Sequence, residues 1–319
     1  MKYTNNALNI LTAKTFKGIG DAWVYNHLEQ VQPYEVIVEL LQKTADEKVT
    51  EEIFLNIREN IEQKILKLGE NCDGVVALGD DNFPAYRGNV KASDRPTVLF
   101  YKGNLELLSL ENYNIAVIGV LSPTPEIEQD ERKMVTTLVE KNAVIVSGLA
   151  LGCDRIAHHQ SLKAGGSTIG ILPSPLNDII PKECIPLANY MAENGSLLIT
   201  EYYDQPKSKL EANGRFIKRD RLQALFSNAV ILTASYKPDS IDPKEMKIDS
   251  GSRHAMEKAK EYGLLRGVMY HNKNKNNPKF DLNRQIIKED NNVIVIDPQN
   301  ASQTTQHLFI SQEQQSSLF

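Results

Sequence analysis

Apolar positions follow two different periods along this chain. Between about Ala7 and Leu68 they recur at helical spacing. From Tyr113 onward, short β-branched runs alternate with amphipathic stretches. The pattern therefore predicts a small helical domain over residues 1–70 and a larger α/β domain over residues 71–298, which begins with extended structure.

Seven strands and at least three intervening helices are expected after Tyr113. Each strand candidate is rich in Val, Ile or Leu. Buried strands that alternate with helices predict a Rossmann-like, doubly wound and mostly parallel sheet. The strand candidates are residues 114–120, 143–149, 167–173, 196–202, 228–234, 265–271 and 292–297, and the helix candidates are residues 127–142, 153–165 and 185–195.

The segment "AVIVSGLALGCDRIAHH" (143–159) has the order strand, glycine-rich turn, helix. That order places backbone N–H groups around an anion. We expect Ser147, Gly148 and Gly152 to shape such a site, with Asp154 in the first turn of the helix and His158 supporting the loop. The ligand can be a strand phosphate, a single phosphate or a free nucleotide.

Ligands of doubly wound sheets bind beyond the carboxyl ends of the strands. Three loops should meet there, at residues 119–125, 147–154 and 250–252. Gly119, Ser250, Gly251 and Ser252 therefore join the candidate phosphate-binding residues.

The 319-residue chain has a formal net charge of −5, so any nucleic-acid contact requires local positive charge. Residues 207–221 hold six basic and two acidic residues, a local charge of +4. Lys218, Arg219 and Arg221 are therefore candidates for phosphate contacts. The alternative is a structural arginine that pairs with a buried carboxylate such as Glu201.

A second glycine turn lies in "FKGIGDAWVYNHL", with the outline of a helix-hairpin-helix or SAM-like unit. Lys17, Gly18 and Gly20 can offer a phosphate contact there. The alternative is a glycine turn in a small structural bundle.

Other chemistry has little support in the sequence. A dinucleotide fingerprint and a Walker A loop are both missing, and we expect no cofactor and no catalysis. Cys153, Asp154, His158 and His159 suggest a metal cluster only on paper, so we expect no metal. A phosphoribohydrolase-like enzyme, with Glu257 after residues 250–252, remains an alternative, although Glu257 reads more simply as a solvated helix residue.

Taken together, the segments resemble the DprA/Smf (DNA-processing protein A) family. Its pattern V-S-G-x-A-x-G-I-D-x-x-A-H is matched by "VSGLALGCDRIAH", and "LLITEYYDQP", "FIKRDRLQALFSNAVILTAS" and "DSGSRHAMEKAKEYG" resemble its later signatures. The chain departs from the family at Leu121 and Leu151, where the family has arginines of its anion pocket. It looks like a divergent branch, without the winged-helix domain of many members.

This resemblance implies a protein that binds single-stranded DNA through a phosphate pocket with a basic rim. Family members load a recombinase during natural transformation, and some DprA-like proteins restrain a toxin or effector in phage-defence or toxin–antitoxin modules. We accordingly expect a cytoplasmic, non-membrane protein, a homodimer, with single-stranded DNA and a recombinase or toxin as partners.

Residues 299–319 are rich in Gln and Ser and are expected to form a flexible tail. Its end, "QQSSLF", is similar to the peptide that binds the bacterial sliding clamp. Gln315, Leu318 and Phe319 would make that contact, and the alternative is that Leu318 and Phe319 dock on the protein's own surface.

Overall fold

The computed structural model describes residues 1–245 and 248–309. Within these residues nine strands form one sheet in the order β1-β2-β6-β5-β4-β3-β7-β8-β9. All seven strands expected from the sequence are present, as β3 to β9. The strands are β1 Gly74–Ala77, β2 Val98–Gly103, β3 Tyr113–Ile118, β4 Ala143–Ser147, β5 Thr168–Leu172, β6 Leu197–Thr200, β7 Ala229–Leu232, β8 Leu265–Met269 and β9 Ile294–Ile296.

The strands from β6 to β9 in this order are parallel, whereas β2 pairs antiparallel with both β1 and β6. From β3 the chain moves outward in one direction through β4, β5 and β6, and then returns to place β7 on the other side of β3. This reversal makes the carboxyl ends of β3 and β7 the place where a doubly wound sheet takes its ligand.

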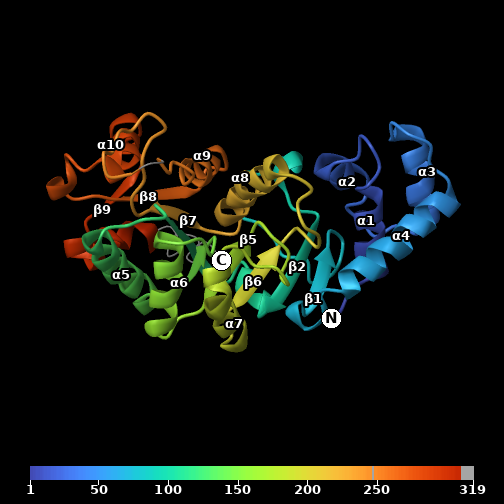
Figure 1. Cartoon of the computed structure of the whole chain (residues 1–319), viewed down its shortest axis with the longest axis horizontal. Helices are drawn as coiled ribbons and strands as arrows, with labels where there is room; N and C mark the ends of the chain where they lie inside the picture. The colour runs from blue at the N-terminus through green and yellow to red at the C-terminus, as the bar shows by residue number, and fades with distance from the viewer. Residues whose placement is uncertain (246–247, 310–319) are drawn as a thin grey trace, which may run out of the picture.

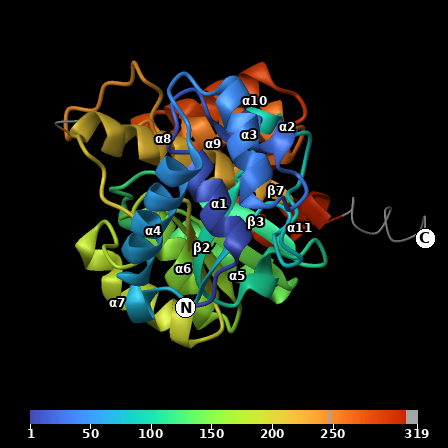
Figure 2. The same ribbon diagram turned by 90° about the vertical axis from the view of Figure 1, so that its right-hand side faces the viewer.

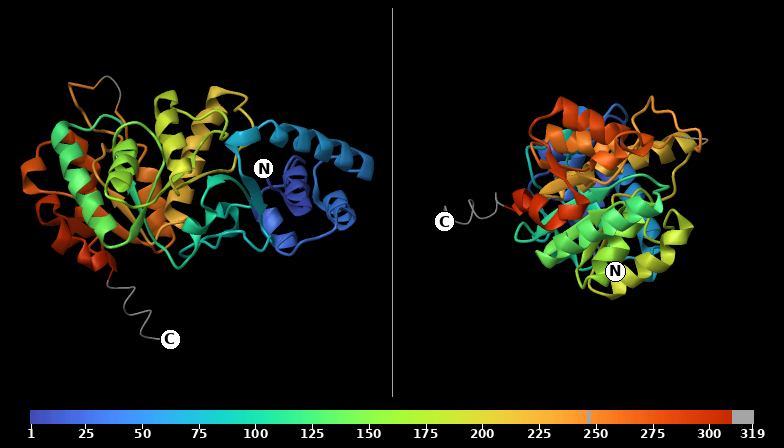
Figure 3. Two further views of the ribbon diagram at one scale, coloured as in Figure 1. Left: turned by 90° about the horizontal axis from the view of Figure 1, so that it is seen from below. Right: turned by 90° about the vertical axis from the view of Figure 1, so that its left-hand side faces the viewer.

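Helices cover both faces of the sheet, as the doubly wound fold requires. In Figure 1, α5, α6 and α7 lie below the strands and α8, α9 and α10 lie above them. Seen from below, α5 and α6 lie side by side (Figure 3). Their bounds are α5 Pro125–Glu140, α6 Cys153–Lys163, α7 Ile185–Glu193, α8 Lys209–Leu225, α9 Arg253–Glu261 and α10 Asp281–Glu289.

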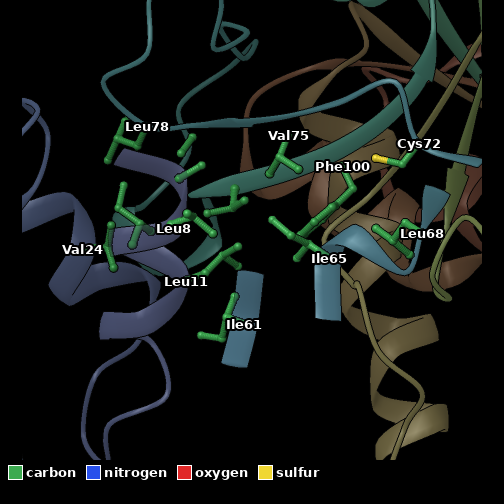
Figure 4. Packing of buried hydrophobic residues seen from close by; sticks show 14 of the residues in the cluster. Leu8, Leu11, Val24, Ile61, Ile65, Leu68, Cys72, Val75, Leu78 and Phe100 are labelled. Carbon is green, nitrogen blue, oxygen red and sulfur yellow. The ribbon is translucent and has the colours of Figure 1, made fainter. Parts of the chain in front are cut away.

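The N-terminal helices pack against the β1 edge of the sheet (Figure 2). They are α1 Asn5–Ala13, α2 Asp21–His27, α3 Tyr34–Thr44 and α4 Glu51–Leu66. Leu8, Ile61 and Ile65 share one hydrophobic cluster with Val75 and Phe100 of the sheet (Figure 4). The helical region and the sheet are therefore joined by a continuous core.

The sequence expectation of a flexible tail from residue 299 does not hold for residues 299–309. They form a short 3₁₀ turn and helix α11 (Ala301–Thr304), and Leu308 is fully buried. Phe309 packs on Tyr113 with ring centroids 5.0 Å apart. Residues 298–304 contact α5, and the apolar residues Leu308 and Phe309 pack on the domain. Gln315, Leu318 and Phe319 lie outside the described residues.

None of the helices in the described part of the chain is long and apolar enough to cross a membrane.

Candidate nucleic-acid interface

The three loops expected at the carboxyl ends of the strands do meet. The Leu121 N–H group donates to Oδ2 of Asp249 (3.1 Å), and the Ser252 hydroxyl donates to the carbonyl of Gly119 (3.0 Å). These contacts tie the segment before α9 to the loop after β3.

The serines and the glycine before α9 have internal partners as well. The Ser250 hydroxyl accepts from the Arg253 guanidinium (3.0 Å), and the Gly251 N–H group donates to Oδ1 of Asp249 (3.2 Å). In this structure these residues order the start of α9. Phosphate contacts by Ser250, Gly251 and Ser252 stay a prediction.

The glycine-rich loop after β4 already contains an anion, which is the chain's own Asp154. One carboxylate oxygen of Asp154 accepts from the N–H groups of Gly148 (3.1 Å) and Ala150 (3.4 Å). The Ser147 hydroxyl donates to the carbonyl of Val117 (2.7 Å) and holds β4 to β3. The backbone anion site expected here is thus filled, at these two N–H groups, by a side chain rather than left open to a phosphate.

The two loop glycines are required by internal packing. A Cβ on Gly152, whose φ is +72°, would collide with the carbonyl oxygens of Val120 and Leu121. A Cβ on Gly148 would collide with the Arg219 guanidinium. Close approach of a ligand is not needed to explain either glycine.

His158 stabilises the packing of α6 on the sheet, beneath the loop after β4. It is fully buried, and its Nδ1 lies 2.7 Å from the Thr168 hydroxyl, which donates to the Ile145 carbonyl. Burial lowers the pKa of His158 to about 3, so the ring is neutral at physiological pH. Among the described residues, no group of three or more His, Cys, Asp or Glu side chains is placed to hold a metal ion.

The basic residues of α8 are largely neutralised inside the protein. Arg219 is 5% exposed, and its Nη1 donates to the carbonyls of Gly148 (2.5 Å) and Ile171 (2.8 Å). Arg221 forms a buried ion pair with Glu201 (2.6 Å). Arg221 therefore fits the structural alternative stated above. Both guanidinium groups are almost fully buried, and phosphate contacts by Arg219 and Arg221 stay a prediction.

Lys218 forms an ion pair with the N-terminal helices. Its ammonium lies 2.8 Å from Asp21, which also pairs with Lys14 (2.5 Å). The carboxylates of Asp21, Glu201 and Asp204 thus offset part of the local +4 of residues 207–221. Sequence reasoning missed this because Asp21 is 197 positions away from Lys218.

The glycine turn before α2 faces acidic residues. A Cβ on Gly18 would meet the Asp46 carboxylate, and the Lys17 N–H group donates to the Glu47 carboxylate (2.7 Å). A phosphate at Lys17, Gly18 and Gly20 would lie against these two carboxylates. The geometry favours the bundle-turn alternative.

The charge beneath the loops is acidic. Asp154 and Asp220 lie near Arg219, and Asp249 lies near Asp220. Burial raises the pKa of Asp220 to about 7; Asp154 and Asp249 add to the rise, and Arg219, whose Nε lies 3.1 Å from Asp220, opposes it. The acidic side chains here outnumber the one arginine.

Positive charge is available on the outer face of α6. A hollow of about 570 Å³, here called the α6 groove, opens between α5, α6 and the loop after β3. It is bounded by residues that come from these three elements: Leu121, Ser122, Pro123, Glu128, Arg132, Gly152, Arg155, Ile156, His159 and Lys163.

Three exposed side chains of α6 face this groove at helical spacing. Arg155, His159 and Lys163 are four residues apart, and neither Arg155 nor Lys163 has an ion-pair partner among the described residues. Arg132 faces them from α5, and it is paired with Glu128 (2.7 Å). The signal in the sequence is the spacing along α6. Where Asp154 and His158 point inward, Arg155 and His159, which directly follow them, point outward.

His159 contributes an uncharged ring. Partial burial and the guanidinium groups of Arg155 and Arg132 lower its pKa, so it is neutral at pH 7. Leu121 and Leu151 lie at the loop tips, 48% and 36% exposed. The groove therefore joins two cations, which have no ion-pair partner in the part of the chain that the structure describes, to a neutral ring and the apolar side chain of Leu121.

Known proteins resemble this chain over most of its length. A profile of the family described as DNA recombination-mediator protein A matches residues 74–306. The DNA processing protein DprA of Bacillus subtilis (strain 168) is 35% identical over 139 residues, which are 44% of this chain and 45% of that protein. The chain spans about half the length of the curated relatives that head the comparison.

Two solved structures share the fold. The X-ray structure of DNA processing protein A from Streptococcus pneumoniae has a TM-score of 0.62 at 23% identity, over 91% of this chain and 98% of that chain. DNA processing protein A from Helicobacter pylori, described for its single-stranded DNA binding mode, has a TM-score of 0.55 at 25% identity, over 71% and 98%. Since the family profile covers well over half of the sequence, the chain belongs to the DNA recombination-mediator protein A family.

Proposed function

We propose that this protein binds single-stranded DNA and presents it for recombination, without catalysis of its own. The α6 groove carries the proposal: Arg155 and Lys163 are exposed cations without an ion-pair partner among the described residues, and Arg155 lies in the first turn of α6, beside the carboxyl end of β4. A hollow of about 570 Å³ suits a short stretch of sugar and phosphate, because small-ligand sites enclose roughly 300–1,000 Å³.

Exposed cations bind the phosphate backbone of nucleic acids. Each phosphate neutralised by Lys or Arg releases counterions, and this release dominates the affinity of nucleic-acid complexes. Arg155 and Lys163 lie two helical turns apart, about 12 Å along α6, so they suit two phosphates of an extended strand that are not adjacent. The H. pylori relative, described as binding single-stranded DNA, supports the same ligand.

A role without catalysis fits the buried nucleophiles. Burial raises the pKa of the thiols of Cys72, Cys153 and Cys184, which keeps them protonated and inert. Glu257, the acid of the phosphoribohydrolase alternative, is 66% exposed and lies within 4.0 Å of Arg253 on its own helix.

The experiment is a fluorescence-anisotropy titration of the full chain with labelled single- and double-stranded oligonucleotides at two salt concentrations. We expect tighter binding of the single strand, with affinity falling as salt rises. Equal or absent binding of both forms would contradict the proposal.

A second candidate is a protein partner such as a toxin or effector. It is favoured by Leu121 and Leu151, which expose apolar surface where the family resemblance implies arginines. The variant Leu121→Arg/Leu151→Arg separates the two functions. Tighter single-strand binding supports DNA as the ligand, whereas unchanged DNA binding together with lost neutralisation of a co-expressed neighbouring gene product supports the protein partner.

A further inference from the structure

A second hollow adjoins the α6 groove on the other side of α6. It measures about 300 Å³ and lies between α6 and α7, lined by Arg155, His159, Glu183, Pro186, Leu187 and Tyr190. Arg155 and His159 line both hollows. A ligand can therefore extend from one to the other across the exposed face of α6.

The second hollow has a different chemistry from the α6 groove. Its wall on α7 is formed by Pro186, Leu187 and Tyr190. Tyr190 is 54% exposed, and within the described residues no aromatic ring stacks on it and its hydroxyl has no hydrogen-bond partner. A large, open aromatic side chain next to a cation is the arrangement on which proteins stack bases of single strands.

Charge determines which part of a ligand each of the two hollows can accept. The Glu183 carboxylate borders the second hollow and disfavours a phosphate there, whereas Arg155 and Lys163 favour one in the α6 groove. His159, neutral at pH 7, lies between them and leaves room for an uncharged group. The charged part of a ligand therefore belongs to the first hollow and its uncharged, flat part to the second.

We propose that the second hollow is a nucleobase subsite, in which a base stacks on Tyr190 while its own phosphate lies against Arg155 in the α6 groove. This inference rests on the proposed function, because it adds a base contact to a bound single strand. It makes Tyr190 a binding residue that has no part in the fold of the sheet.

The test uses two oligonucleotides of equal length and charge: one with ordinary bases and one with abasic sites throughout its centre. Tyr190→Ala is compared with Tyr190→Phe, which keeps the ring, and with Leu110→Ala, a 57% exposed apolar residue on the loop before β3, as a surface control. Anisotropy gives the affinities, and a 2-aminopurine base in the ordinary strand reports stacking by its quenching.

Tyr190→Ala should weaken binding of the ordinary strand about tenfold, the usual size of one base–aromatic stack. Its slope of log affinity against log salt should stay the same, since no charge is removed. Tyr190→Phe and Leu110→Ala should bind like the wild type, the abasic strand should not distinguish Tyr190→Ala from the wild type, and quenching should be lost only in Tyr190→Ala.

Two results would overturn the inference, and they can be told apart. If the wild type binds single strands but Tyr190→Ala binds the ordinary strand as tightly as the wild type does, the base subsite is wrong and the proposed function stands. If the folded wild type binds neither strand, both the function and the subsite are wrong.

Discussion

Arg221 and Glu201 form an ion pair inside the protein, with Nη2 and Oε1 2.6 Å apart and side-chain exposures of only 4% and 5%. The guanidinium also donates to the carbonyls of Asp94 and Lys218. The pair links the C-terminal part of α8 to the residue that follows β6. An arginine on a basic helix can therefore hold the fold together and leave nothing for a ligand.

Removing Arg221 should destabilise the protein strongly. Arg221→Ala leaves Glu201 buried without its partner, which typically costs about 3–5 kcal/mol of unfolding free energy. Arg221→Met/Glu201→Met removes both charges and should recover most of the loss. Urea unfolding measures both. A stable Arg221→Ala protein that no longer binds single-stranded DNA would instead make Arg221 a phosphate contact.

Asp154 should be replaceable by an external anion at its loop. Asp154→Ala leaves the N–H groups of Gly148 and Ala150 without an acceptor, which should cost about 1–3 kcal/mol. Inorganic phosphate should then raise the melting temperature of Asp154→Ala more than that of the wild type. If phosphate stabilises the wild type equally, the loop has a site that Asp154 does not fill.

A substitution of Gly152 should lower the unfolding free energy of the protein, whether or not it affects ligand binding. Gly165 is the matched control, because its φ of +82° is similar but no atom lies near its missing Cβ. Gly165→Ala should cost only the about 1–2 kcal/mol of a left-handed residue. Gly152→Ala adds a clash with two carbonyls and should cost clearly more by urea unfolding; equal costs would show that the loop moves freely.

Glu131 on α5 should make the protein less stable as the pH rises. It is fully buried, its oxygens have no hydrogen-bond partner of normal geometry in the described part of the chain, and burial holds its pKa well above 4.5. Above about pH 4.5 the unfolded chain releases a proton that the folded protein keeps, so stability falls with pH.

Glu131→Gln removes this dependence. Its stability relative to the wild type should grow between pH 5 and pH 8, by at most about 1.4 kcal/mol per pH unit. Glu140→Gln, an exposed acid of the same helix, is the control. Parallel stability curves for wild type and Glu131→Gln would show that Glu131 is ionised in the folded protein.

The sheet was predictable and the site only in part, for a physical reason. The residues of β4 and of similar strands are hydrophobic almost throughout. Such a run can be recognised from residues that are neighbours in the sequence. The residue types of the loop after β4 were also recognisable. Whether Asp154 faces its own loop or a ligand, and whether Arg221 meets Glu201 or a phosphate, depends on contacts between distant elements. The cations of α6 were found only when their buried neighbours had fixed which face is outside.

The central claim is that the outer face of α6 binds the phosphates of single-stranded DNA. The most direct measurement is the slope of log affinity against log salt for a labelled single strand, in wild type, Arg155→Ala/Lys163→Ala and the control Lys43→Ala on distant α3. The double variant should bind more weakly, with a slope smaller by about 0.7 for each lost phosphate contact, while Lys43→Ala should match the wild type. A folded double variant with unchanged affinity and slope would contradict the claim.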